Sequence, residues 1–225
     1  MVEGDAVVKD VCADCNNVVL SKYDGHAKNV LDNAGIFRRN YLDDTLTLEY
    51  DYKLFSRWLL KLAFNSSRAS GIQEKEFGDL KKHIIEETSE ASHIFILVGL
   101  FSPVKLTEEE RNKYGLALDE ADGNFINPFQ LRFSWPVNIQ KHVSIKQIVI
   151  GAMLFRVFVF DKNITRQNRK DLLNKYLETM KGMSLLRKNK SKLQVKQIKE
   201  SFLDSMVPHM LRPEVSAHLE KLTIR

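Results

Sequence analysis

Apolar residues recur every three or four positions in several segments of the chain, and this spacing predicts amphipathic helices. The helices predicted in this way cover residues 16–33, 51–68, 72–88, 107–114, 165–180, 191–210 and 215–222. Two pairs of residues have the three-residue spacing of a capping box, Ser70 with Gln73 and Thr107 with Glu110. Each pair is therefore expected to begin a helix.

Other segments are continuously apolar or alternate between apolar and polar residues, which predicts β-strands. These segments cover residues 45–50, 93–101, 129–135, 143–150 and 153–160. Pro136 is expected to end the third strand, and Gly151-Ala152 predicts a tight antiparallel hairpin between the last two. The pattern as a whole predicts an α+β fold, with a small antiparallel sheet, a C-terminal hairpin and flanking helices.

A polar break at Ser66–Gly71 divides the chain into two predicted parts. Residues 1–71 hold the only cysteines and the first helices, and residues 72–225 form an α+β part that ends in basic helices. A length of 225 residues suffices for one buried core or for two small lobes that share an interface. The apolar content of 44% excludes a disordered chain.

The longest apolar run, Ile94 to Phe101, is far shorter than the roughly 20 residues that span a bilayer. The first residues carry no basic segment followed by an apolar one, as a signal peptide would. Two cysteines in a close pair form no disulfide framework. We therefore expect a cytoplasmic protein without a membrane partner.

Positive charge collects toward the end of the chain, although the net charge is only +5. Residues 161–225 carry fifteen basic and seven acidic side chains. Five lysines form the densest basic patch and are the predicted nucleic-acid-binding residues: Lys188, Lys190, Lys192, Lys196 and Lys199. The last three have the spacing of one helix face, which would suit contacts with backbone phosphates. The alternative is a solvated helix face with no partner.

Cys12 and Cys15 form a CxxC motif just before or on the first turn of a predicted helix. Two thiolates supply half of the four ligands of a structural zinc site, so these cysteines are candidate ligands for Zn²⁺. A second copy of the chain or another polypeptide would complete the site. His26, eleven residues after Cys15, could also complete the site across a turn, but it would lie about 16 Å away on a continuous helix. The alternatives are a pair of free thiols and a redox motif at a helix start.

The string VCADCNNVVLSKYDGHAK, from Val11 to Lys28, resembles the second half of an HNH-type zinc finger in bacterial HNH-like proteins. Cys12 and Cys15 match the second ligand pair of that finger, and Asn16 matches the asparagine that follows it. The run RWLLKLA from Arg57, and the segment 145–160, are similar to later parts of these proteins. The resemblance implies a zinc ion and a nucleic-acid partner.

The chain departs from the HNH pattern where catalysis would take place. No cysteine or histidine precedes Cys12, so the upstream ligand pair and the water-activating histidine have no counterpart. Val18-Val19 stand in place of the expected Gly-Trp. We therefore expect a nucleic-acid-associated protein that resembles a truncated HNH nuclease, and an endonuclease only if an upstream half is supplied. The alternative is an interaction or regulatory protein with no nucleic-acid role.

The remaining histidines form no metal-binding pair in the sequence. They are His83, His93, His142, His209 and His218. Each is expected to be a surface histidine or a hydrogen-bonded histidine of the core.

Overall fold

A computed structural model describes residues 15–70, 74–86, 91–114, 125–128 and 132–210 of the chain. Its strands are β1 (Thr45–Glu49), β2 (Ile94–Ser102), β3 (Arg132–Gln140), β4 (Val143–Ile150), β5 (Met153–Phe160), β6 (Ser184–Leu185) and β7 (Lys192–Ser201). Its helices are the π-helix η1 (Cys15–Leu20), α1 (Ser21–Asn33), the 3₁₀-helix η2 (Arg39–Leu42), α2 (Tyr52–Ser70), α3 (Glu74–Gly78), α4 (Leu80–Ile85), α5 (Glu108–Tyr114), α6 (Arg166–Thr179) and α7 (Phe202–Met210).

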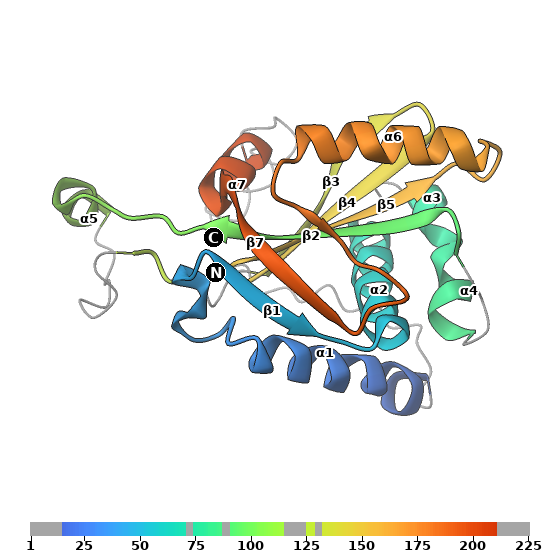
Figure 1. The fold of residues 1–225 in the computed structure, drawn as a ribbon, viewed down its shortest axis with the longest axis horizontal. Helices are drawn as coiled ribbons and strands as arrows, with labels where there is room; N and C mark the ends of the chain where they lie inside the picture. Colours follow the sequence, from blue (N-terminus) through green and yellow to red (C-terminus); the bar gives the residue numbers. More distant parts are fainter. Residues whose placement is uncertain (1–14, 71–73, 87–90, 115–124, 129–131, 211–225) are drawn as a thin grey trace, which may run out of the picture.

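The strands form one sheet in the order β1-β7-β2-β5-β4-β3, with β6 paired to β2 (Figure 1). All pairs are antiparallel except β2 with β7, which is parallel. The α+β class expected from the sequence is confirmed. The sheet has seven strands and is larger than the small sheet that was expected.

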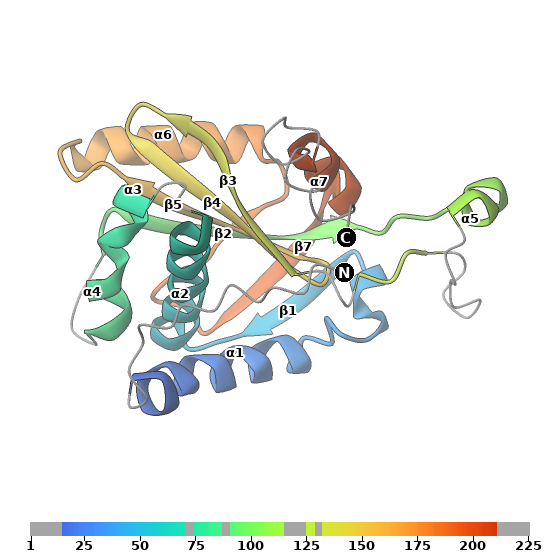
Figure 2. The ribbon, with the colours of Figure 1, turned by 180° about the vertical axis from the view of Figure 1, so that it is seen from behind.

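Helices cover both faces of the sheet. Helices α1 and α2 pack on one face, where Val98 and Phe155 belong to the same apolar cluster as Leu59 of α2. Helices α6 and α7 lie on the other face, where Leu173 and Phe202 pack with residues of β2, β4 and β5. Figures 1 and 2 show the two layers from opposite sides, with α5 projecting away from the rest. None of the described helices is long and apolar enough to cross a lipid bilayer.

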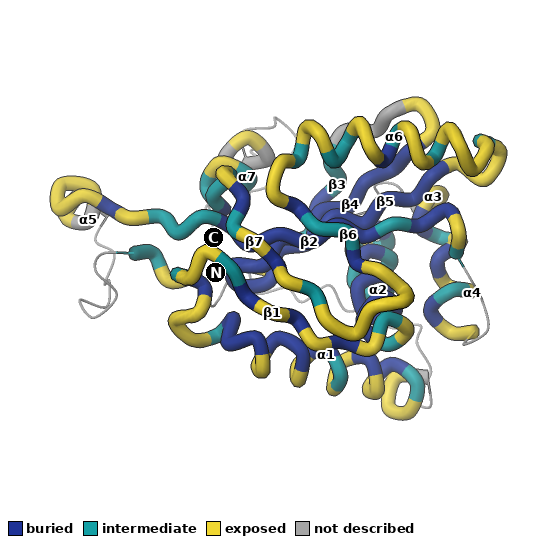
Figure 3. Tube along the Cα trace, viewed as in Figure 1, coloured by how far each residue is buried: buried dark blue, intermediate teal, exposed yellow. Residues whose placement is uncertain are grey.

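The hairpin of β4 and β5 forms the centre of the sheet. Every residue of these two strands is buried, since each strand is covered on both faces (Figure 3). The tight turn between them contains Gly151 with φ of +58°, a conformation that costs other residues energy. The predicted hairpin is therefore confirmed, and so is the turn at Gly151-Ala152.

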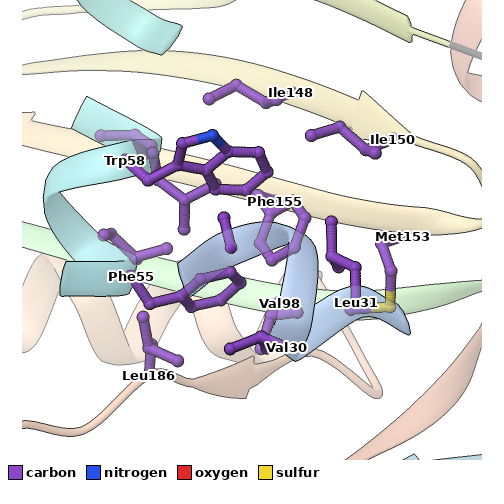
Figure 4. Packing of buried hydrophobic residues seen from close by; sticks show 14 of the residues in the cluster. Val30, Leu31, Phe55, Trp58, Val98, Ile148, Ile150, Met153, Phe155 and Leu186 are labelled. Carbon is purple, nitrogen blue, oxygen red and sulfur yellow. The ribbon is translucent and has the colours of Figure 1, made fainter. Parts of the chain in front are cut away.

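Aromatic side chains fill the cluster between α2 and the hairpin (Figure 4). The ring of Phe155 meets those of Phe55 and Trp58 edge to face, with ring centroids 5.8 and 6.5 Å apart. This cluster draws residues from both sides of position 71, including Leu46 of β1 and Ile96 of β2. Residues from both sides of position 71 thus contribute to this cluster.

Three local predictions need correction. Residues 192–201 form strand β7 instead of the predicted helix, which begins only at Phe202. Strand β3 continues through Pro136, which faces Lys146 of β4. β3 is an edge strand, which is where a sheet accommodates a proline. The helix expected at 72–88 is divided into α3 and α4 at Asp79.

Several predicted helix starts agree with the structure. Thr107 and Glu110 form the capping box of α5, in which the Glu110 carboxylate accepts from the Thr107 backbone N–H at 2.8 Å. The hydroxyl of Thr165 caps α6 and accepts from the Asn168 N–H at 3.2 Å. Ser70 is the last residue of α2, whereas Gln73, its partner in the expected capping box, and the helix expected at 215–222 lie outside the described residues.

A buried polar network joins the sheet to α7. Arg156 is 9% exposed, and its Nε donates to Oε1 of Gln147 at 2.8 Å. Its Nη2 donates to the carboxylate of Glu200 at 3.1 Å, while the Gln147 amide donates to the Ser205 hydroxyl. The side chains of this network come from β4, β5, β7 and α7, so the network holds these elements together.

Candidate anion-binding groove

A groove lies at the end of the sheet where β2 begins and β5 ends. Because these strands are antiparallel neighbours, the start of one lies beside the end of the other. The backbone N–H of Phe160 donates to the carbonyl of His93 at 3.0 Å. Residues about 70 positions apart, around His93 and Lys162, are thereby brought into one place.

Helix α4 forms one wall of this groove, and Arg57 of α2 holds it in position. The guanidinium of Arg57 donates to the carbonyl of His83 at 3.2 Å and to that of Glu86 at 3.1 Å. Leu80 and Ile84 turn the opposite side of the helix into the core. Lys81, Lys82 and His83 are left lining the groove.

The first turn of α6 and the loop before it form the other wall. Figure 1 shows α4 and one end of α6 at the same end of the sheet. The Nζ of Lys162 donates to Oδ2 of Asp79 at 2.6 Å, which ties the two walls together. This ammonium also holds the pKa of the Asp79 carboxyl below its ordinary value. One turn into α6, Arg169 lines the same groove.

The groove encloses about 840 Å³ and is rich in cations. Its lining residues are Gly78, Asp79, Lys81, Lys82, His83, Ile85, Glu86, Ser92, His93, Lys162 and Arg169. Both carboxylates already face a lysine, since Glu86 lies 3.9 Å from Lys82 in addition to the pair described above. Within the described part of the chain, Lys81 and Arg169 form no ion pair, and the buried Nε of Arg169 has no hydrogen-bond partner.

Two histidines of the groove lining, His83 and His93, lie with their rings close together. The ring centroids of His83 and His93 are 5.5 Å apart, with the rings tilted by 59°. His93 is 6% exposed, and burial, followed by the nearby His83, Lys162 and Arg169, lowers its pKa to about 4. Burial and the ammonium groups of Lys162 and Lys82 also lower the pKa of His83 below its ordinary value of 6.5. Both imidazoles are therefore mainly neutral at pH 7.

The predicted lysine patch lies elsewhere in the structure. Lys188 and Lys190 lie in the exposed turn before β7, and Lys192 and Lys196 share one exposed face of that strand. Lys192 pairs with Glu49 of β1 at 2.6 Å. Lys199 lies near the end of β7, where the pairing with β2 shifts register. Because β7 is a strand, the expected helix face of Lys192, Lys196 and Lys199 does not form.

The predicted zinc ligands are only partly within the described chain. Cys12 lies outside the described residues. Cys15 is the first residue of η1, and the structure describes its backbone alone. The helical backbone continues from η1 into α1, which carries His26 away from Cys15. The Nε2 of His26 accepts from the Asp51 N–H at 3.0 Å, so this ring fixes the start of α2. In the described ranges, no three His, Cys, Asp or Glu side chains gather where they would hold a metal ion.

Sequence reasoning assigned His83 and His93 to scattered surface or core positions and did not pair them. Their partners Lys162 and Arg169 are also absent from the predicted patch. The sequence feature that could have indicated the groove is the position of these residues. His93 immediately precedes one buried strand, and Asp161-Lys162 immediately follow another. Only the antiparallel pairing of those strands brings the two segments together.

Comparison of the chain with protein-family models, with curated proteins and with solved structures gives no match.

Proposed function

We propose that this protein binds nucleic acid by its phosphate backbone in the groove between α4 and α6. The observation that carries the proposal is the lining of the groove, in which Lys81 and Arg169 lack counter-ions within the described chain. The Arg169 guanidinium lines the groove without a carboxylate partner within the described chain, which favours a bound anion. Phosphate oxygens are strong acceptors for such donors.

The open form of the groove favours an extended polyanion. Lys81 and Lys82 are exposed on the rim of one wall, and Lys162 is exposed on the rim of the other. A strand that crosses the groove would meet cations on both sides, as in other electrostatic channels for nucleic acid. The basic residues Arg166 and Lys170 extend the positive charge along the exposed side of α6. Binding of this kind is expected to depend strongly on salt and weakly on base sequence.

The double variant Lys81→Glu/Arg169→Gln is expected to weaken the binding of a single-stranded oligonucleotide by at least about tenfold at low salt, because it removes both unpaired cations. The slope of log Kobs against log salt concentration is also expected to become smaller by about one to two. Fluorescence anisotropy of an end-labelled RNA or DNA strand, titrated at several salt concentrations, measures both quantities.

The matched control is Lys188→Glu/Lys190→Gln, which makes the same change of charge in the turn before β7. This control is expected to leave the affinity within about twofold of the wild type. A loss confined to the control would move binding to the lysine patch predicted from the sequence and contradict the groove. No binding by the wild type at low salt would favour the alternative, an interaction protein without a nucleic-acid role.

A further inference from the structure

We propose that this groove cleaves RNA without a metal ion, with His93 as the general base and His83 as the general acid. The inference rests on the proposed function, since the substrate must lie in the groove between α4 and α6. It adds a reaction and a substrate class: intramolecular phosphoryl transfer at a ribose 2′-hydroxyl.

The geometry provides two imidazoles side by side in the lining of one groove. The ring centroids are 5.5 Å apart and both residues line the groove. In the proposed complex one imidazole meets the attacking 2′-oxygen and the other meets the departing 5′-oxygen of the same phosphate. A general base or acid must come within hydrogen-bond distance of its proton, about 3 Å between heavy atoms. The backbone around both rings is fixed, by Arg57 at the His83 carbonyl and by strand pairing at the His93 carbonyl.

The reaction needs no group that the groove lacks. His93 accepts the proton of the 2′-hydroxyl as the 2′-oxygen forms a bond to phosphorus, and the bond between phosphorus and the 5′-oxygen breaks. His83 gives its proton to the departing 5′-oxygen. The products are a 2′,3′-cyclic phosphate and a 5′-hydroxyl, and exchange with water then returns both histidines to their starting protonation. DNA has no 2′-hydroxyl and cannot react in this way.

The cations of the groove would stabilise the transition state. Negative charge builds up on the two non-bridging oxygens of the phosphorus as the new bond forms. Arg169 lines the groove beside the histidines, and Lys162, on the α6 wall with Arg169, is held in position by its bond to Asp79 of the opposite wall. Donors that are fixed before the reaction starts are the most effective in this role.

The two histidines have environments that separate their roles. His93 has a pKa of about 4 and stays neutral, as a base must, whereas the more exposed His83 keeps a proton to a higher pH. The charged groups that surround the pair are Asp79, Lys82 and Glu86 near α4, Lys162 and Arg169 on the α6 side, and Arg57 from α2. The active form, with His83 protonated and His93 neutral, is most abundant between about pH 4 and the lowered pKa of His83.

The test uses the full chain, excess EDTA and a labelled single-stranded RNA, with a DNA of the same sequence as the control. RNA is expected to be cut to 2′,3′-cyclic phosphate ends, and DNA is expected to bind but stay intact. His83→Ala and His93→Gln should each lower the rate by about 10²- to 10⁴-fold while the RNA affinity measured by anisotropy changes little. The profile of kcat/KM against pH should be bell-shaped, with its maximum below pH 6.5.

Bound but uncut RNA would overturn this inference and leave the proposed function standing. Cleavage that survives in both variants, or that also occurs in DNA, would overturn it as well. If His93→Gln does not fold, His83→Ala and the DNA control decide the question. Failure of the wild type to bind RNA at all would instead remove the proposed function.

Discussion

Phe155→Ala is expected to lower the free energy of unfolding by about 4 kcal/mol, the largest loss among the single changes considered. The side chain is 0% exposed and lies on the central strand β5, between Val98 of β2 and Ile148 of β4. Its removal leaves Phe55 and Trp58 without their edge-to-face partner and creates a cavity that the rigid sheet cannot close. Such a loss is a large part of the roughly 5–15 kcal/mol that stabilises a typical domain.

Urea unfolding followed by tryptophan fluorescence measures this loss, because both tryptophans, Trp58 and Trp135, are buried. Val18→Ala is a suitable control, since Val18 is 55% exposed and should change stability by less than about 0.5 kcal/mol. An equally small effect of Phe155→Ala would mean that the cluster between α2 and the hairpin does not carry the fold.

Lys146→Met is expected to raise the free energy of unfolding at pH 7, by up to about 3 kcal/mol. Lys146 lies on β4 beneath α2 and α3 and is 0% exposed. Its Nζ has no hydrogen-bond partner within the described chain and lies 5.7 Å from the centre of the Phe77 ring. Burial lowers the pKa of this ammonium from 10.5 to about 8, so the charged form destabilises the native state. Methionine has a similar shape and no charge.

The pH dependence distinguishes this cause from simple repacking. Below pH 8 the lysine is protonated in both states, and the native protein bears the full cost. Between about pH 8 and 10.5 the native state loses its proton first, so the unfolded state binds more protons and stability rises with pH. The advantage of Lys146→Met over the wild type should therefore shrink between pH 7 and pH 10. Urea unfolding at the two pH values tests this, and Lys141→Met is the exposed control. A constant difference would contradict the assignment.

The local hydrophobic pattern does not determine the secondary structure of β7. Leu193 and Val195 alternate as in a strand, but Val195, Ile198 and Phe202 also have helical spacing. The choice between them is made by β1 and β2, which pair with β7 on its two sides. Such pairing depends on residues about 90 to 150 positions earlier in the chain. Consequently the lysines of this segment lie on a strand and its turn instead of a helix.

The sequence by itself determined the α+β class, the hairpin at Gly151-Ala152 and the starts of α5 and α6. These features arise from hydrophobic periodicity, turn chemistry and capping, which act between residues a few positions apart. Only the tertiary structure decided the groove, because it is made by residues 78–86, 92–93 and 162–169. The antiparallel pairing of β2 with β5 brings these segments together, and the lowered pKa values of His83 and His93 follow from that burial. Neither the contact nor its electrostatic effect is encoded in any short stretch of the chain.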